Sequence, residues 1–255
     1  MKVLYPYIFK RKSFHLFRDN KTRTYYKDYN SLSQNELDEV YKIFKSIKPL
    51  FDDIRVDIRI EKTSSTRGEE YSILFYSEKK DGYLANIGYI GEILDLKLVA
   101  LNIGTLWYGI GKTNDTYSGL SFITTMMIAK VPENVFRKDM FKSKRKSLEE
   151  IYDGSIYKDI LNIARFSPSS CNTQPWFVKE NNNILEIYRY KKPGKRGIMP
   201  IEKVIYQNLI DMGIFILFLS ILFEYNNIKF TLKSYNDNEN NLDEYNHSFD
   251  VIIDN

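Results

Sequence analysis

The sequence predicts an α+β protein built from two successive halves, each with the order helix, strand, strand, helix, strand. Apolar residues recur with period two at 54–60 and with spacings of three and four at 87–101. The same order of patterns returns after about 120 residues. We expect halves 1–146 and 147–255 to pack like the subunits of a dimer, with antiparallel sheets around long buried helices.

Composition narrows the class of protein. The 255 residues are 43% hydrophobic and 27% charged, which is typical of a folded globular chain and argues against disorder. The formal net charge of +4 does not require a nucleic-acid partner. With Cys171 as its only cysteine, the chain cannot form an internal disulfide, and His15 and His247 are too few for a multi-histidine metal site. We therefore expect a cytoplasmic protein.

The first half begins with a capping-box pattern at Ser33 and Glu36, in which each residue satisfies a backbone N–H of the other. This pattern predicts a helix over 33–51. The elements expected after it are strands at 54–60 and 71–76, an amphipathic helix over 87–101 closed by Gly104, and a strand at 122–131.

The second half follows a basic run at 142–146 and a second capping pattern at 147–150. The run of twelve residues at 212–223 is apolar on all sides, and about 20 would be needed to cross a bilayer. A helix in a soluble core is the better interpretation. The full set expected here is a helix at 155–166, strands at 176–179 and 184–190, the buried helix, a strand at 228–232, an Asn/Asp-rich loop at 235–247 and an edge strand at 249–253.

Three segments carry groups suited to binding a ligand. In the first, Lys10-Arg11-Lys12-Ser13, the arginine fork and the hydroxyl suit a phosphate monoester. In the second, over 167–176, two prolines stiffen a loop of small polar side chains that could lie against a polar ring. In the third, over 104–112, three glycines allow close approach of the backbone, although the pattern is not G-x-G-x-x-G.

Each segment also has a purely structural interpretation. The first could be a solvated basic turn, the second a helix end followed by a turn with Trp176 in the core, and the third a helix C-cap with an ordinary turn. Spacing alone favours these structural interpretations for the second and third segments.

Taken together, the segments resemble the FMN-dependent nitroreductase family. The run S-P-S-S-C-N-T-Q-P-W is similar to that family's P-S-S-x-N-x-Q-P-W loop, and Arg11-Lys12-Ser13 resembles its R-x-S phosphate motif. The run N-I-G-T-L-W-Y-G resembles its G-L-G-T-x-W-x-G segment. The stretch 144–151 is similar to a basic segment that supplies further phosphate contacts.

The R-x-S and P-S-S-x-N motifs lie about 155 residues apart, so the chain resembles the single-chain, internally duplicated branch of the family. The resemblance implies a nitroreductase-like fold with one complete FMN site per chain and no catalytic side chain. The residues that it assigns to the cofactor are Arg11, Lys12, Ser13, Trp107, Tyr108, Gly109, Ile110, Lys144, Arg145, Pro168, Ser169, Ser170 and Asn172.

The same resemblance implies a ping-pong oxidoreductase in which NAD(P)H reduces the flavin and a nitro compound, quinone or similar small acceptor then takes the electrons. It implies a monomer that imitates a dimer, with neither nucleic acid nor membrane as partner. Three alternatives stay open: a flavin-binding protein without turnover, a thiol enzyme using Cys171 with His15, and a nucleic-acid or membrane-surface protein resting on the basic run at 142–146.

Overall fold

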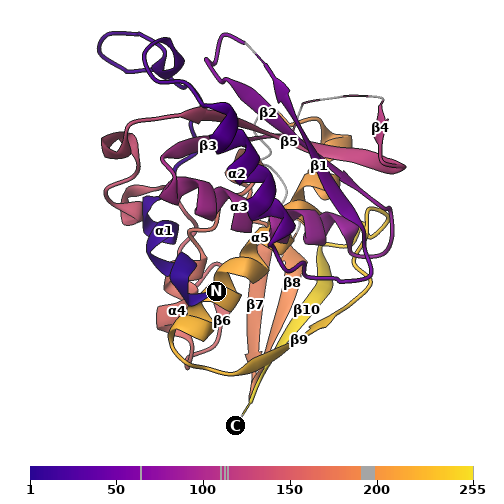
Figure 1. Ribbon diagram of the computed structural model, residues 1–255. Coiled ribbons are helices and arrows are strands. Elements are labelled where there is room, and N and C mark those ends of the chain that lie inside the picture. The colour runs from indigo at the N-terminus through magenta and orange to yellow at the C-terminus, as the bar shows by residue number, and fades with distance from the viewer. Residues whose placement is uncertain (64, 110, 112, 114, 191–198, 255) are drawn as a thin grey trace. The chain divides into compact units, whose positions relative to one another are not determined.

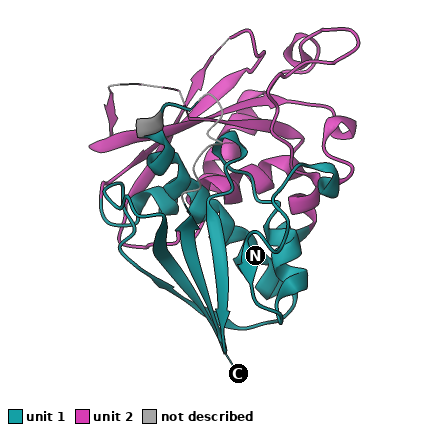
Figure 2. Cartoon of the chain, turned by 180° about the vertical axis from the view of Figure 1, so that it is seen from behind, with its two compact units in different colours: residues 1–5, 80–89, 140–255 teal, residues 6–79, 90–139 magenta. Residues whose placement is uncertain are grey.

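The computed structural model describes residues 1–63, 65–109, 111, 113, 115–190 and 199–254. The chain forms two compact units, drawn in two colours in Figure 2. Unit 1 comprises Met1–Tyr5, Lys80–Tyr89 and Met140–Asn255, and unit 2 comprises Pro6–Lys79 and Ile90–Asp139. Helix α3 (Tyr83–Ala100) begins in unit 1 and ends in unit 2.

Unit 2 holds an antiparallel sheet with the order β1-β2-β5-β3, and β4 pairs with β5 beside it. The register pairs Ile58 with Phe75 and Phe75 with Thr124, which places Phe75 over the middle of the sheet. The strands are β1 (Val56–Lys62), β2 (Tyr71–Ser77), β3 (Ile103–Tyr108), β4 (Thr116–Tyr117) and β5 (Leu120–Lys130).

The first helices are α1 (Tyr5–Lys10) and α2 (Gln34–Lys45). The predicted capping box is confirmed, because the Ser33 side chain accepts from the Glu36 backbone N–H and the Glu36 carboxylate accepts from the Ser33 backbone N–H. Helix α2 ends at Lys45, earlier than the predicted end at 51. Pro49 explains the early end, since a proline disfavours helical geometry in the residue before it.

Unit 1 holds a second sheet with the order β6-β7-β8-β10-β9, in which only the β6–β7 pair is parallel. Without the short strands β4 and β6, the two sheets share one order: first strand, second, last and then third. The predicted α+β architecture with antiparallel sheets is confirmed. The strands are β6 (Tyr152–Asp153), β7 (Trp176–Asn181), β8 (Ile184–Tyr190), β9 (Phe230–Ser234) and β10 (Tyr245–Ile253).

Helix α5 (Ile201–Tyr225) lies along the sheet of unit 1 (Figure 1). Residues 207–223 are all buried, and the Trp176 ring of β7 stacks on Phe215 at 4.7 Å between centroids. By length and composition the stretch Lys203–Tyr225 could cross a membrane, but 83% of its most apolar window is buried inside the protein. The prediction of a core helix is confirmed.

Helices α3 and α5 cross at two glycines. A Cβ atom added to Gly88 would lie 1.9 Å from the carbonyl oxygen of Ile210, and one added to Gly213 would lie 1.8 Å from that of Ala85. Each glycine therefore faces the residue three positions before the other glycine. This reciprocal contact is the pattern of an isologous interface, here within one chain.

The prediction for α3 was wrong in two respects. The helix is buried on nearly all sides instead of amphipathic, because Glu92 and Asp95, which the pattern would place in solvent, are fully buried against Arg11. It also ends at Ala100 without Gly104, which lies inside β3. The turn is made by Asn102, whose φ of 57° is left-handed.

The end of the chain also differs from the prediction. Strand β10 begins four residues earlier than expected and lies between β8 and β9, so β9 forms the edge instead. An irregularity between His247 and Phe249 shifts the register, which interrupts the alternation that marks a strand. Helix α4 (Lys158–Ala164) is shorter than expected, and the capping pattern at 147–150 opens no helix, although Glu150 accepts from the Ser147 backbone N–H.

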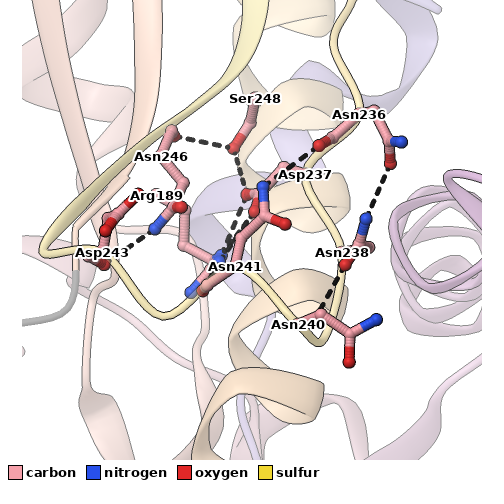
Figure 3. A network of polar contacts seen from close by, with 9 residues as sticks. All are labelled: Arg189, Asn236, Asp237, Asn238, Asn240, Asn241, Asp243, Asn246 and Ser248. Atoms are coloured by element: carbon pink, nitrogen blue, oxygen red, sulfur yellow. Dashed lines mark hydrogen bonds and ion pairs between the residues drawn. The ribbon is translucent and has the colours of Figure 1, made fainter.

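The Asn/Asp-rich loop neutralises a buried arginine (Figure 3). Arg189 of β8 is fully buried, and its Nε and Nη2 atoms donate to the carboxylate of Asp237 at 2.9 and 2.7 Å. Nη2 also donates to the carbonyl of Asn241, and Ser248 donates to Asp237. The loop therefore stabilises the sheet of unit 1.

Candidate functional site

The R-x-S segment follows α1 and lies beside β3 in unit 2. Ser13 forms an isolated parallel bridge with Thr105, and the backbone N–H of Phe14 donates to the Thr105 carbonyl at 2.9 Å. The Phe14 side chain enters a buried cluster with Leu106 and Met127. Two contacts thus hold the segment: the backbone of Ser13 and Phe14 pairs with β3, and the Phe14 ring packs in the core.

Arg11 points into the protein and is only 4% exposed. Its Nε lies 2.8 Å from Asp95 Oδ2 and 2.9 Å from Glu92 Oε1, and its Nη1 donates to Ser13 Oγ at 3.2 Å. Burial raises the pKa of Glu92 to about 8, against the opposing effect of Arg11. The ion pairs compensate the desolvation of the guanidinium.

The remaining nitrogen of Arg11, Nη2, is buried and has no hydrogen-bond partner within the described residues. Buried donors are nearly always paired, so this atom indicates a missing acceptor. Lys12 and Arg137 lie nearby: the Arg137 backbone N–H donates to the carbonyl of Lys10, and Lys12 Nζ donates to that of Val135.

Positive charge accumulates around these side chains. Burial and the nearby Arg11 lower the pKa of Arg137, and burial and Arg137 lower the pKa of Lys12. Among the described residues, neither Lys12 nor Arg137 forms an ion pair with a carboxylate. Three cations, one of them with a free buried donor, fit an anion with several acceptor oxygens, such as a phosphate monoester.

Trp107 and Tyr108 are the last two residues of β3, and the exposed Gly109 follows; Ile110 lies outside the described residues. The Trp107 Nε1 donates to Glu92 Oε2 at 3.0 Å, and its ring stacks on Phe75. Glu92 therefore connects the Arg11 guanidinium with the end of β3. Of the segment with three glycines, residues 104–108 thus lie in β3.

The loop at 167–176 follows α4 in unit 1. Cys171, Asn172 and Gln174 all have left-handed backbones, with φ of 50°, 57° and 50°. Pro168 is buried, whereas Cys171 and Asn172 are exposed. Trp176 is fully buried in the core, as the structural interpretation expected. Non-glycine residues in this conformation are held by their surroundings and cluster at functional sites.

Helix α5 holds this loop from the protein interior. The carboxylate of Asp211 accepts from the backbone N–H of Ser170 at 2.9 Å and from its hydroxyl at 3.2 Å. The Thr173 hydroxyl donates to Asn208 at 3.1 Å. Burial raises the pKa of Asp211 to about 7, against the effect of these hydrogen bonds.

The basic segment lies against the same loop. Arg145 Nη1 donates to Asn172 Oδ1 at 2.9 Å, and Asn172 Nδ2 donates to the Lys144 carbonyl at 3.2 Å. The backbone N–H of Lys146 donates to Gln174 Oε1. The structure thus brings Lys144 and Arg145 together with Asn172, where Arg145 supports the loop.

The predicted residues fall into two sets. Unit 2 holds the set at 11–13 and 107–109, and unit 1 holds the set at 144–145 and 168–172. Sequence reasoning did not identify Glu92, Asp95, Arg137 or Asp211. Acidic residues inside the apolar helices α3 and α5 were an available signal, because a buried carboxylate needs partners.

The structure thus combines a two-sheet α+β fold with an R-x-S segment beside β3 and a P-S-S-x-N loop after α4. The family model described as "Putative TM nitroreductase" matches residues 4–221 of the chain. The chain therefore belongs to this nitroreductase family and to the oxidoreductases.

One solved structure supports the fold, and two others are similar to a lesser degree. A "putative nitroreductase" from Thermotoga maritima MSB8 is 17% identical with a TM-score of 0.62, over 98% of this chain and 93% of that one. A "putative NADH dehydrogenase/NAD(P)H nitroreductase" from Parabacteroides distasonis ATCC 8503 is 9% identical with a TM-score of 0.42, over 60% of this chain and 99% of that one. A "putative NADH oxidase" from Clostridium acetobutylicum is 10% identical with a TM-score of 0.41, over 59% and 99%. A comparison with curated proteins finds none that matches.

Proposed function

We propose that the protein is an FMN-dependent oxidoreductase that passes electrons from NAD(P)H to a nitro compound, a quinone or a similar small acceptor by a ping-pong mechanism. The observation that carries the proposal is the unpaired, buried Nη2 of Arg11 beside Ser13. Membership of a nitroreductase family supports the redox class, and the choice of NAD(P)H as electron donor follows from the resemblance of the motifs.

In this proposal the phosphate end of FMN binds to residues of unit 2. Arg11 Nη2 and the Ser13 hydroxyl provide donors, and Lys12 and Arg137 provide charge. Asp95 keeps Arg11 in place through its Nε, with 2.8 Å between Nε and Oδ2. An arginine oriented in advance loses less side-chain entropy when the anion binds.

The ring end binds to residues that the family resemblance assigns. Pro168, Ser169, Ser170 and Asn172 form its wall, and 107–110 supply backbone N–H groups. When bound, FMN supplies the two-electron chemistry, and the chain orients the ring and limits the access of water. No side chain is needed as a general acid or base.

We propose further that the two halves arose by duplication and that one chain binds one FMN. The shared strand order of the two sheets and the reciprocal contact of Gly88 and Gly213 support this view. The R-x-S segment at 11–13 that the resemblance assigns lies in one half, and the P-S-S-x-N run at 168–172 lies in the other. The protein would then act as a cytoplasmic monomer without nucleic acid or membrane.

Titration of the apoprotein with FMN and with riboflavin tests the phosphate site. We expect FMN to bind at least 10-fold more tightly than riboflavin, since charge-assisted hydrogen bonds contribute about 1.5 to 3 kcal/mol each. Stopped-flow mixing of the FMN complex with NADH or NADPH then tests turnover. Binding without reduction by either donor would establish the alternative of a flavin-binding protein. Equal affinity for FMN and riboflavin would contradict the phosphate site.

A further inference from the structure

The loop at 168–174 has a conformation that its own sequence does not favour. Three of its residues, none of them glycine, have left-handed backbones. Such a conformation is unfavourable for residues that carry a Cβ, less so for asparagine, and it persists only when the surroundings hold it. The loop therefore depends on contacts with other elements.

Asp211 supplies the central contact. Its Oδ1 accepts from both the backbone N–H and the hydroxyl of Ser170, at 2.9 and 3.2 Å, and its Oδ2 lies 3.5 Å from the Thr173 hydroxyl. One carboxylate thus connects both sides of the left-handed pair 171–172. The Gln207 side chain, one turn earlier on α5, also contacts the Ser170 hydroxyl.

Asp211 has no evident purpose in folding alone. It is 1% exposed in an otherwise apolar stretch of α5, and no cation pairs with it among the described residues. Burying a carboxylate without a counterion is unfavourable, and a leucine or alanine would suit this helix better. A costly group that contacts the loop through hydrogen bonds indicates a role in the loop.

We propose that Asp211 is a positioning residue that fixes the 168–174 loop in the shape that receives the isoalloxazine ring. The part of this proposal that concerns the ring rests on the proposed function, whereas the part that concerns the loop does not. Asp211 acts through Ser170 and Thr173 and need not touch the cofactor. Its influence should therefore fall on the ring and not on the phosphate end.

Three variants separate these effects. Asp211→Asn keeps an acceptor for Ser170 and removes the titratable group. Asp211→Ala removes the acceptor. Ser220→Ala is the control, since Ser220 is also a buried polar residue of α5, and its hydroxyl contacts Ile216 of its own helix and Tyr89 of α3 but, among the described residues, none of the loop.

Hydrogen exchange of the apoprotein reports on the loop without any cofactor. In Asp211→Ala we expect the Ser170 amide to exchange at least 10-fold faster, with the wild-type rate nearly restored in Asp211→Asn and unchanged in Ser220→Ala. A fluorine tag on Cys171, the only cysteine, gives a second readout of the same segment. Wild-type exchange and an unchanged tag signal in Asp211→Ala would overturn the proposal.

Flavin titrations give the second arm. Asp211→Ala should lower the affinities for FMN and for riboflavin by the same factor, about 10-fold or more. Asp211→Asn should lower both affinities by less than 3-fold. Loss confined to FMN would contradict a ring-side role. If the wild-type chain bound no flavin, the proposed function would fail, while the exchange experiment would still decide whether Asp211 positions the loop. Should Asp211→Ala not fold, Asp211→Ser replaces it in every measurement.

Discussion

Replacing Arg11 with alanine should destabilise the apoprotein strongly. The guanidinium is 4% exposed and lies within 2.9 Å of carboxylate oxygens of both Glu92 and Asp95, which are fully buried. Removing one partner of a buried ion pair typically costs about 3 to 5 kcal/mol, because the other charge stays buried without compensation. We therefore expect Arg11→Ala to lower the free energy of unfolding by about 3 kcal/mol or more at pH 7.

Urea unfolding of the apoprotein measures this effect, with Lys12→Ala as the control. Lys12 is only partly buried and donates to a backbone carbonyl, so its loss should cost about 1 kcal/mol or less. The loss in free energy of unfolding caused by Arg11→Ala should be smaller at pH 5 than at pH 8. At pH 5 the buried carboxyls that have lost their partner are protonated and carry no charge. Adding Asp95→Asn to Arg11→Ala should restore part of the lost free energy of unfolding, because asparagine leaves no unpaired charge in the interior. A change below about 0.5 kcal/mol in Arg11→Ala would refute the reasoning.

Three further predictions concern other contacts. Gly213→Ala should lower the free energy of unfolding by about 1 to 3 kcal/mol, because its Cβ would overlap the Ala85 carbonyl. This loss should outweigh the better helix propensity of alanine. Thermal unfolding measures it, with Ser220→Ala as the control. Arg137→Ala should weaken FMN at least 10-fold and leave riboflavin unchanged, as fluorescence titration would show; equal losses would contradict it. Burial raises the pKa of Asp211 to about 7, so the folded protein favours the protonated carboxyl. The stabilisation that this proton provides is complete below about pH 4 and is lost as the pH rises through 7. Asp211→Asn should therefore gain stability relative to wild type between pH 4 and 8 in urea titrations, and a constant difference would exclude the shift.

Patterns within a few residues of sequence correctly predicted those helices and strands whose signals depend only on nearby residues. The alternation at 54–60 and 184–190 and the capping box at Ser33 marked two strands and one helix start, because these signals depend on neighbours within a few residues. The all-round apolar character of 212–223 marked the core helix for the same reason. The fold class followed from the order of these elements.

What the sequence could not predict depends on partners far along the chain. The acidic positions of α3 suggested a solvent-exposed face, and the approach of Arg11, more than 80 residues earlier, explains their burial together with the donors Trp107 and Thr105. Strand β10 was shortened in the prediction because an irregularity at His247 breaks its alternation. Asp211 and the loop that it holds are joined across about 40 residues, with no local pattern to show it.

The family resemblance assigned residues to the cofactor, and the structure shows which protein groups these residues contact. Arg11 was expected to face a phosphate; its Nε and Nη1 are engaged by Asp95, Glu92 and Ser13, and its Nη2 is left unpaired among the described residues. Lys144 and Arg145 were candidates for the same phosphate, without a choice between them, and Arg145 donates to Asn172. Arg137 is therefore the stronger candidate for the additional cation.

Native mass spectrometry of the protein reconstituted with FMN tests the central claim most directly. We predict a monomer that carries one FMN, because the R-x-S segment at 11–13 and the P-S-S-x-N loop at 168–172 come from different halves. Two FMN molecules on each chain, a single FMN shared by two chains, or a chain that takes up none would contradict it.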